Sequence, residues 1–275
     1  MNETQKTIED FGEQWQTFRS NPGFYGAVAL LSDIMGPLLP AEDLRGARVA
    51  EIGSGTGRIV NMLLDAGASH VWAVEPSAAM DILQANTAGR SGKITCLPIP
   101  GEQLPADLGL EYVFSIGVIH HIPDPRPVLH AAYRALRPGG KLLIWVYGRE
   151  GNETYLSFAE PMRKMTKRLP HFALLALTAV LYVFLELYIF LCRFLPLPMH
   201  VYMRNVLARF PHVTRYMTIY DQLNPAYAKY YREAEARALV ADAGFQDVRL
   251  YHRHDYSWSV IGTKPENPKA GQSGR

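Results

Sequence analysis

The chain has 275 residues, which fits one large domain or a domain with an insertion. Apolar residues make up 48% and charged residues 20%, the balance of a globular protein with a sizeable core. The formal net charge of +2 lends no support to nucleic-acid binding, so we expect no nucleic-acid partner. Cys96 and Cys192 each lie in an apolar run. We therefore expect no disulfide framework and a cytoplasmic location.

The first 149 residues predict helices followed by a regular alternation of strands and helices. Residues 1–45 predict helices and loops around "FGEQWQTF" and "NPGFYG". The predicted strands lie at 47–53, 70–76, 94–100, 111–117 and 137–148, and the helices between them at 58–67, 77–89 and 124–136. Such alternation with short turns predicts a parallel sheet with helices on both faces.

The alternation stops near residue 150 and resumes near residue 226. An amphipathic helix is predicted at 227–245, and two strands joined by a tight turn at 246–265. We therefore expect one domain made of 46–149 and 226–264, with 150–225 as an insertion. The Pro/Gly-rich, polar tail at 265–275 is predicted to be disordered.

The most specific pattern is "VAEIGSGTGRIV", a strand that runs into a glycine turn and then a helix. Glycines allow unusual dihedrals and close ligand approach, and the helix start offers free N–H groups. The third glycine, Gly57, comes one residue too early for the dinucleotide fingerprint. Glu51 precedes the turn and suits a cationic ligand. Glu75 ends the next strand, where an acid can accept both hydroxyls of a ribose.

Four motifs in order resemble the class I S-adenosylmethionine-dependent methyltransferases: "EIGSGTG", "VEPS", "SIGVIHHIPDP" and "LRPGGKLLI". The resemblance covers roughly 11–149 and 226–264. It implies a Rossmann-like, seven-stranded, mostly parallel sheet with helices on both faces and a large helical insertion after strand five. "FGEQW" resembles an N-terminal segment that closes over the cofactor in some members, although Trp15 fits a core position equally well.

The resemblance also implies the cofactor, S-adenosylmethionine, and the residues that bind it. Many members carry an acid where Gly101 stands, so the adenine contact is open between Gly101 and Glu102. The implied cofactor-binding residues are Trp15, Glu51, Gly53, Ser54, Gly55, Thr56, Gly57, Glu75, Pro76, Gly101, Glu102, Gln103, Ser115, Ile116 and Gly117.

Two neighbouring histidines are the candidates for catalysis. His120 and His121 follow the fourth strand, and a histidine titrates near neutral pH, so either could act as a general base. The alternative is a capping or packing role. The "HRHD" run at 252–255 resembles metal-ligand spacing, but a solvated strand face is the favoured interpretation, and no metal site is predicted.

The stretch at 172–192 is apolar enough to cross a bilayer and carries one charge, Glu186. A single crossing would separate strands of one sheet, so we expect the stretch to leave and return on one side. The basic "RKMTKR" at 163–168 suits peripheral membrane contact through 163–198. The alternatives are a buried cap over the acceptor pocket and a homodimer interface.

The predicted function is methyl transfer from S-adenosylmethionine to a hydrophobic or lipid-linked small molecule, at oxygen, nitrogen or carbon. One alternative is a methyltransferase for a soluble sugar or secondary metabolite, with the apolar stretch as a cap or dimer interface. Another is a catalytically silent cofactor-binding protein that docks a partner through its apolar helix.

Overall fold

The computed structural model describes residues 3–166, 169–224 and 227–266, without the side chains of residues 3, 158, 160, 163–165 and 171. The tail predicted to be disordered at 265–275 lies almost entirely outside the described residues. The side chains of the basic residues within 163–168 lie outside them as well.

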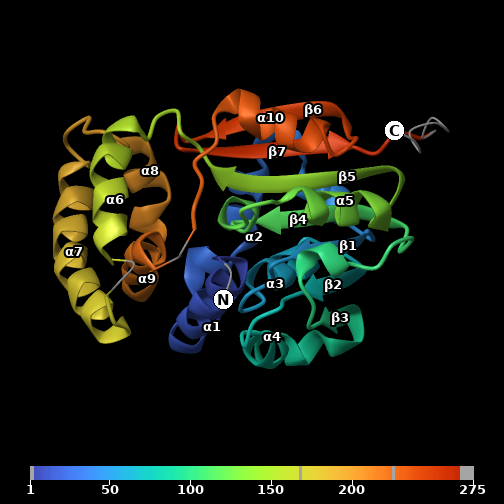
Figure 1. The fold of residues 1–275 in the computed structure, drawn as a ribbon, viewed down its shortest axis with the longest axis horizontal. Coiled ribbons are helices and arrows are strands. Elements are labelled where there is room, and N and C mark those ends of the chain that lie inside the picture. Colours follow the sequence, from blue (N-terminus) through green and yellow to red (C-terminus); the bar gives the residue numbers. More distant parts are fainter. Residues whose placement is uncertain (1–2, 167–168, 225–226, 267–275) are drawn as a thin grey trace.

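A seven-stranded sheet forms the centre of the molecule, in the order β3-β2-β1-β4-β5-β7-β6 (Figure 1). Strands β1 to β5 run parallel, and β7 runs antiparallel to both β5 and β6. The predicted Rossmann-like fold class is thereby confirmed. The strands are β1 (Arg48–Ile52), β2 (His70–Val74), β3 (Ile94–Leu97), β4 (Leu110–Ile116), β5 (Leu136–Tyr147), β6 (Gln246–Arg253) and β7 (Ser257–Thr263).

Two hydrophobic cores cover the two faces of the sheet, because successive residues of a strand point to opposite sides. Val49 and Phe114 belong to the core that contains the residues of α2 and α3. Ala50 and Val113 belong to the core that contains α5 and α10. The helices outside the insertion are α1 (Glu3–Thr17), α2 (Val28–Met35), α3 (Arg58–Asp65), α4 (Met80–Thr87), α5 (Arg126–Ala135) and α10 (Glu233–Ala241).

The predicted helix at 227–245 begins only at Glu233. The segment before it is extended, because the Tyr231 N–H donates to the Tyr147 carbonyl and the Lys229 N–H to the His120 carbonyl. These bonds tie the segment to the end of β5 and to the loop after β4. The backbone of 229–231 therefore borders the site instead of forming a helical turn.

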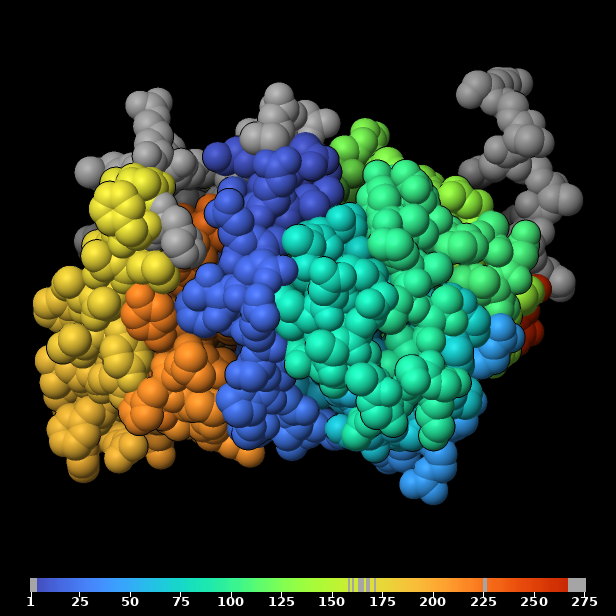
Figure 2. Space-filling model, turned by 90° about the horizontal axis from the view of Figure 1, so that it is seen from below, coloured from blue at the N-terminus to red at the C-terminus, as the bar shows by residue number. Residues whose placement is uncertain are grey.

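Among the described residues, four α-helices lie between β5 and α10 in the chain and gather beside one end of the sheet (Figure 1). They are α6 (Glu153–Thr166), α7 (His171–Leu191), α8 (His200–Asn205) and α9 (His212–Leu223). Helix α1 lies between these helices and the rest of the molecule, as Figure 2 also shows. The insertion contacts this N-terminal helix through the Gln14–Asp221 bond, and it also contacts the end of β5 directly through the Gln222–Tyr147 bond.

Helix α7 contains the apolar stretch. Among the described residues it is the one helix long and apolar enough to cross a membrane, and 17% of its most apolar window is buried. The strands before and after the insertion pair within one sheet. This pairing agrees with the expectation that the stretch leaves and returns on one side.

Candidate active site

The glycine turn after β1 adopts backbone conformations that only glycine takes easily. Gly53, Gly55 and Gly57 have φ of 80°, 49° and 79°. A Cβ at Gly53 would lie 2.3 Å from a methyl carbon of Val118. The turn therefore brings the backbone close to the loop after β4, and α3 begins directly behind it.

Glu75 is fixed by the backbone at the end of β2. Its carboxylate accepts hydrogen bonds from the N–H groups of Gly55, at 2.7 Å, and Ser77, at 2.9 Å. The residue is 6% exposed. A carboxylate offers about four lone-pair sites, so two acceptor positions remain. This geometry suits a pair of neighbouring hydroxyls such as those of a ribose.

Glu51 is a buried acid at the same edge of the sheet. Burial is the main reason that its pKa rises from 4.5 to about 8, and the nearby charge of Glu75 raises it further, against lowering effects of Ser54 and Arg58. Its Oε2 atom has no hydrogen-bond partner among the described residues. A buried carboxylate oxygen without a donor is costly unless a ligand supplies one, so the residue fits a cationic group.

A cavity of about 160 Å³, here called the first cavity, lies over these residues. Twelve of the predicted cofactor residues line it: Trp15, Glu51, Gly53, Ser54, Gly55, Thr56, Glu75, Pro76, Gly101, Glu102, Ile116 and Gly117. Helix α1 covers it with Phe11 and Trp15. Their spacing of four residues puts both rings on one helix face, a signal that was present in the sequence. Tyr25 and Arg58 also line it and were not predicted.

Three predicted cofactor residues do not line the first cavity. Gly57 packs α3 against α4, since a Cβ there would lie 3.1 Å from Thr87. The buried Ser115 hydroxyl donates to the Ile52 carbonyl at 3.2 Å. Gln103 is exposed on a short 3-10 turn. Motif membership therefore does not separate residues that contact a ligand from residues that shape the turn.

The packing around Gly101 explains why this chain lacks the acid that many members of the family carry at this position. A Cβ at Gly101 would lie 2.6 Å from Ile52 and 3.1 Å from Val128, so no acidic side chain fits at this position. Gly101 and the exposed Glu102 both line the first cavity, and the adenine contact stays open between them.

A second cavity of about 410 Å³ adjoins the first. The two share six lining residues: Phe11, Trp15, Tyr25, Arg58, Ile116 and Gly117. Rings from several elements line the second cavity, namely Trp145, Tyr147, Tyr155, Tyr202, Tyr230 and Tyr256. The insertion contributes apolar side chains such as Leu181, Met203 and Met217. An apolar, ring-lined chamber therefore opens onto the glycine turn.

The two candidate catalytic histidines lie in different places. His121 lines the first cavity, and its Nδ1 lies 2.8 Å from the Tyr227 carbonyl oxygen, so this nitrogen is the donor. His120 lines neither cavity and is fully buried. Its ring centroid lies 3.8 Å from that of Tyr147. This position gives His120 a packing role, so the expectation that it acts as a general base is not supported by its location.

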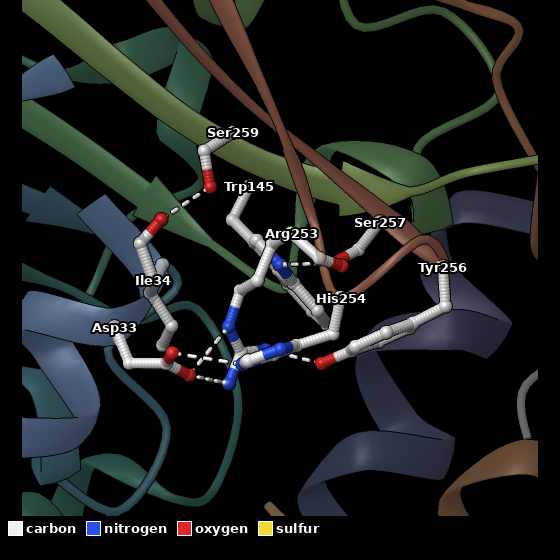
Figure 3. Close-up of polar contacts among 8 residues, drawn as sticks. All are labelled: Asp33, Ile34, Trp145, Arg253, His254, Tyr256, Ser257 and Ser259. Atoms are coloured by element: carbon white, nitrogen blue, oxygen red, sulfur yellow. Dashed lines mark hydrogen bonds and ion pairs between the residues drawn. The ribbon is translucent and has the colours of Figure 1, made fainter. Parts of the chain in front are cut away.

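The "HRHD" run is not a solvated strand face, and that expectation is wrong. Arg253 is 2% exposed and donates to the Asp33 carboxylate of α2 through Nε, at 2.8 Å, and Nη2, at 2.5 Å. His254 lies 2.8 Å from the other Asp33 oxygen, and Arg253 also donates through Nη1 to the Tyr256 hydroxyl oxygen (Figure 3). Arg253 and Tyr256 line the second cavity. This cluster therefore holds the turn between β6 and β7 in place as part of the wall of the second cavity.

Comparison with known proteins identifies the domain. Residues 50–144 match the family model described as a methyltransferase domain. The chain carries a class I S-adenosylmethionine-dependent methyltransferase domain. The predicted family, enzyme class and cofactor are confirmed at this level.

Similar proteins extend this finding. The chain is 30% identical over 118 residues to a tRNA U34 carboxymethyltransferase of Idiomarina loihiensis, covering 41% of this chain and 36% of that protein. It is 30% identical over 112 residues to a ubiquinone biosynthesis O-methyltransferase of the same organism, covering 39% and 45%. An O-methyltransferase family structure from Burkholderia thailandensis shares the fold, with a TM-score of 0.52, 14% identity and coverage of 88% and 56%.

The chain spans about a third to a half of the length of the curated relatives it matches. Several of them are named for a tRNA nucleoside. The exclusion of nucleic acid is therefore wrong, and the restriction to a small-molecule acceptor falls with it. The exclusion of a nucleic-acid partner rested on the net charge of +2. That charge is a sum over the whole chain, so it carries no information on whether one cavity can hold a single base.

Proposed function

We propose that the protein transfers a methyl group from S-adenosylmethionine to a nucleophile carried on an apolar or aromatic group. One observation carries this proposal. The first cavity, at the glycine turn, and the second, ring-lined cavity share Trp15, Ile116 and Gly117. A cofactor in the first and an acceptor in the second would therefore meet where the two cavities join.

The residues of the first cavity fit the cofactor. When bound, S-adenosylmethionine supplies a methyl group activated by a positively charged sulfur. Glu51 offers a buried carboxylate to the cationic amino-acid end, and Glu75 offers two acceptor positions to the ribose. Phe11 and Trp15 of α1 line the cavity and would shield a bound cofactor from water. Positioning of this kind accounts for much of the acceleration expected of such an enzyme.

We assign the parts of the chain accordingly. Residues 46–149 and 226–264 would form the catalytic domain, 1–45 would close over the cofactor, and 150–225 would shape the acceptor site. The apolar and ring-bearing lining of the second cavity supports an acceptor with an apolar body, methylated at oxygen, nitrogen or carbon.

Calorimetry with S-adenosylhomocysteine tests the cofactor site. Gly55→Val places a branched side chain against Trp15, since even a Cβ at Gly55 would lie 3.2 Å from its Nε1. Glu75→Ala removes the ribose acceptor. We expect each change to weaken affinity at least tenfold. Gly92→Val is the matched control, because a Cβ at Gly92 meets nothing within 4 Å. Unchanged affinity in both site variants would overturn the assignment.

A nucleobase is the second candidate acceptor. The names of the tRNA relatives favour it, and enzymes that modify bases hold the extruded base between aromatic side chains. The ring-lined second cavity is compatible with this mode. Transfer of labelled methyl groups to bulk tRNA, with a ribonuclease-treated control, separates it from the first candidate.

We further propose that α7 contacts a membrane surface. Its exposed apolar residues recur every three or four positions, which places them on one helix face. They include Val180, Val183, Phe184, Leu187 and Phe190, each more than half exposed. Val183→Ser with Leu187→Ser should reduce flotation with anionic liposomes, whereas Val213→Ser, an exposed valine of α9, should not. Equal flotation of all three proteins would refute the proposal.

A further inference from the structure

Asp221 is the one carboxylate among the described residues that line the second cavity. It lies on α9, within the insertion. Two cations line the same cavity, Arg58 and Arg253, and Arg253 is paired with Asp33. An acidic group in a largely apolar chamber is one of the few polar groups there that could orient a ligand or accept a proton from it.

Both oxygens of Asp221 are held by donors from other parts of the chain. The Tyr147 hydroxyl donates to Oδ2 at 3.0 Å, and the fully buried Gln14 amide donates to Oδ1 at 2.8 Å. Gln222 donates in turn to the Tyr147 oxygen at 2.8 Å. One donor to each oxygen fixes the plane of the carboxylate and leaves further lone pairs for an acceptor.

Tyr147 is held firmly at the end of β5. Its ring centroid lies 3.8 Å from that of His120 and 5.1 Å from that of Tyr230. Gly117, at the neighbouring end of β4, borders both cavities. Tyr147 therefore holds Asp221 of α9 from a rigid strand end, next to the strand whose end borders the first cavity.

We propose that Asp221 is the general base for an acceptor that carries a hydroxyl group on an aromatic ring, with Tyr147 and Gln14 as positioning residues. This inference rests on the proposed methyl transfer. The acceptor oxygen forms a bond to the methyl carbon while the sulfur–methyl bond breaks and its electron pair returns to sulfur. The hydroxyl proton passes to a carboxylate oxygen of Asp221 and from there to water.

Other groups along the cavity would act on the same hydroxyl. Arg58 of α3 and Asp221 both interact electrostatically with Tyr25, so the two opposite charges act on the same part of the cavity. Besides Tyr147 and the Asp33-paired Arg253, the further titratable groups in the described lining are Tyr25, Tyr155, Tyr202, Tyr230 and Tyr256. Arg58 favours an ionised acceptor, and Asp221 opposes ionisation until the proton can move to it. The test must therefore isolate the contribution of Asp221.

The experiment uses 4-nitrophenol, whose neutral and ionised forms absorb at different wavelengths, bound to the full chain saturated with S-adenosylhomocysteine. Beside Asp221 the bound probe should have a pKa above its value in water, because its anion would face a carboxylate. Asp221→Asn should lower that pKa by about one unit or more. Tyr147→Phe should change it less. Asp124→Asn removes the same charge at an exposed site and should leave it unchanged.

Asp221→Glu is the control for a folding defect in the Asn variant. It keeps the negative charge, so the pKa of bound 4-nitrophenol should stay raised. Failure of 4-nitrophenol to bind the loaded protein, or an equal pKa in wild type and Asp221→Asn, overturns the inference. Failure of S-adenosylhomocysteine to bind wild type would overturn the proposed function instead. For a phenol that is turned over, Asp221→Asn should lower kcat by about 10²–10⁴-fold with the KM for S-adenosylmethionine unchanged.

Discussion

Glu186, the one acid in the apolar stretch, accepts hydrogen bonds from Arg215 Nη1 at 2.9 and 2.7 Å. Arg215 lies on α9 and also donates to the carbonyls of Leu207, Ala208 and Phe210. The charge on α7 is therefore turned inward and organises the insertion. The solvent-facing side of α7 is left apolar, which is the reverse of an ordinary surface helix.

Breaking this pair should destabilise the insertion. We expect Arg215→Lys to cost about 1–2 kcal/mol, because lysine cannot reproduce a forked contact and the three carbonyl bonds together. Glu186→Gln should cost less, since the amide can still accept from Arg215. Chemical denaturation measures both. Arg204→Lys, an exposed arginine of α8, is the control and should be neutral. A neutral Arg215→Lys would contradict the role assigned to the fork.

Gly101 should tolerate alanine poorly, although its backbone conformation is ordinary. The added Cβ would lie 2.6 Å from Ile52, and overpacking of this kind costs about 1–3 kcal/mol. Ile52→Ala opens the space and carries its own cavity cost. The double variant should therefore be more stable than the sum of the two single losses predicts. Strict additivity in a double-mutant cycle would show that the contact with Ile52 is not the cause.

Asp33→Asn should be costly because it leaves the buried Arg253 without a counter-charge. We expect a loss of about 3 kcal/mol, measured by denaturation. Burial tends to raise the pKa of Asp33, but the bonds from His254 and Arg253 outweigh it and hold that pKa below its usual value. The stability it contributes is thus present above the unfolded pKa of 3.8 and lost as pH falls through the lower folded pKa. The Asn variant should lack this acid-dependent loss.

The sequence predicted the residues whose meeting depends on strand order. Glu51, Glu75 and Gly101 lie at or beyond the carboxyl ends of three parallel strands, which share one edge of the sheet, so their proximity is dictated by topology. Gly57 belongs to the same motif but serves helix packing. A pattern of glycines records where the backbone is tight, and it does not say whether a ligand or a neighbouring helix makes it so.

The acceptor side could not be predicted because its contacts are long-range. Gln14 and Asp221 are 207 residues apart, and Asp33 and Arg253 are 220 apart. Neither pair belongs to a local motif or a periodic pattern. Each depends on how α1, α2 and the insertion pack against the sheet, which hydrophobic periodicity within one element does not determine.

Glu51 should couple cofactor binding to pH. Its folded pKa of about 8 lies above the ordinary 4.5, so the ligand-free protein loses stability as pH rises through this interval. A bound cation favours the ionised carboxylate. Affinity for S-adenosylhomocysteine, whose amino group is cationic, should therefore increase with pH up to about 8 and then level off.

Proton release measures this coupling directly. Calorimetry at neutral pH, in buffers of different ionisation enthalpy, should show close to one proton released per bound ligand in wild type. Glu51→Gln cannot ionise, so it should release almost none and bind more weakly at every pH. It should also remove the loss of stability between pH 4.5 and about 8 in the ligand-free protein. Equal proton release in wild type and Glu51→Gln would show that another group takes up the charge of the ligand.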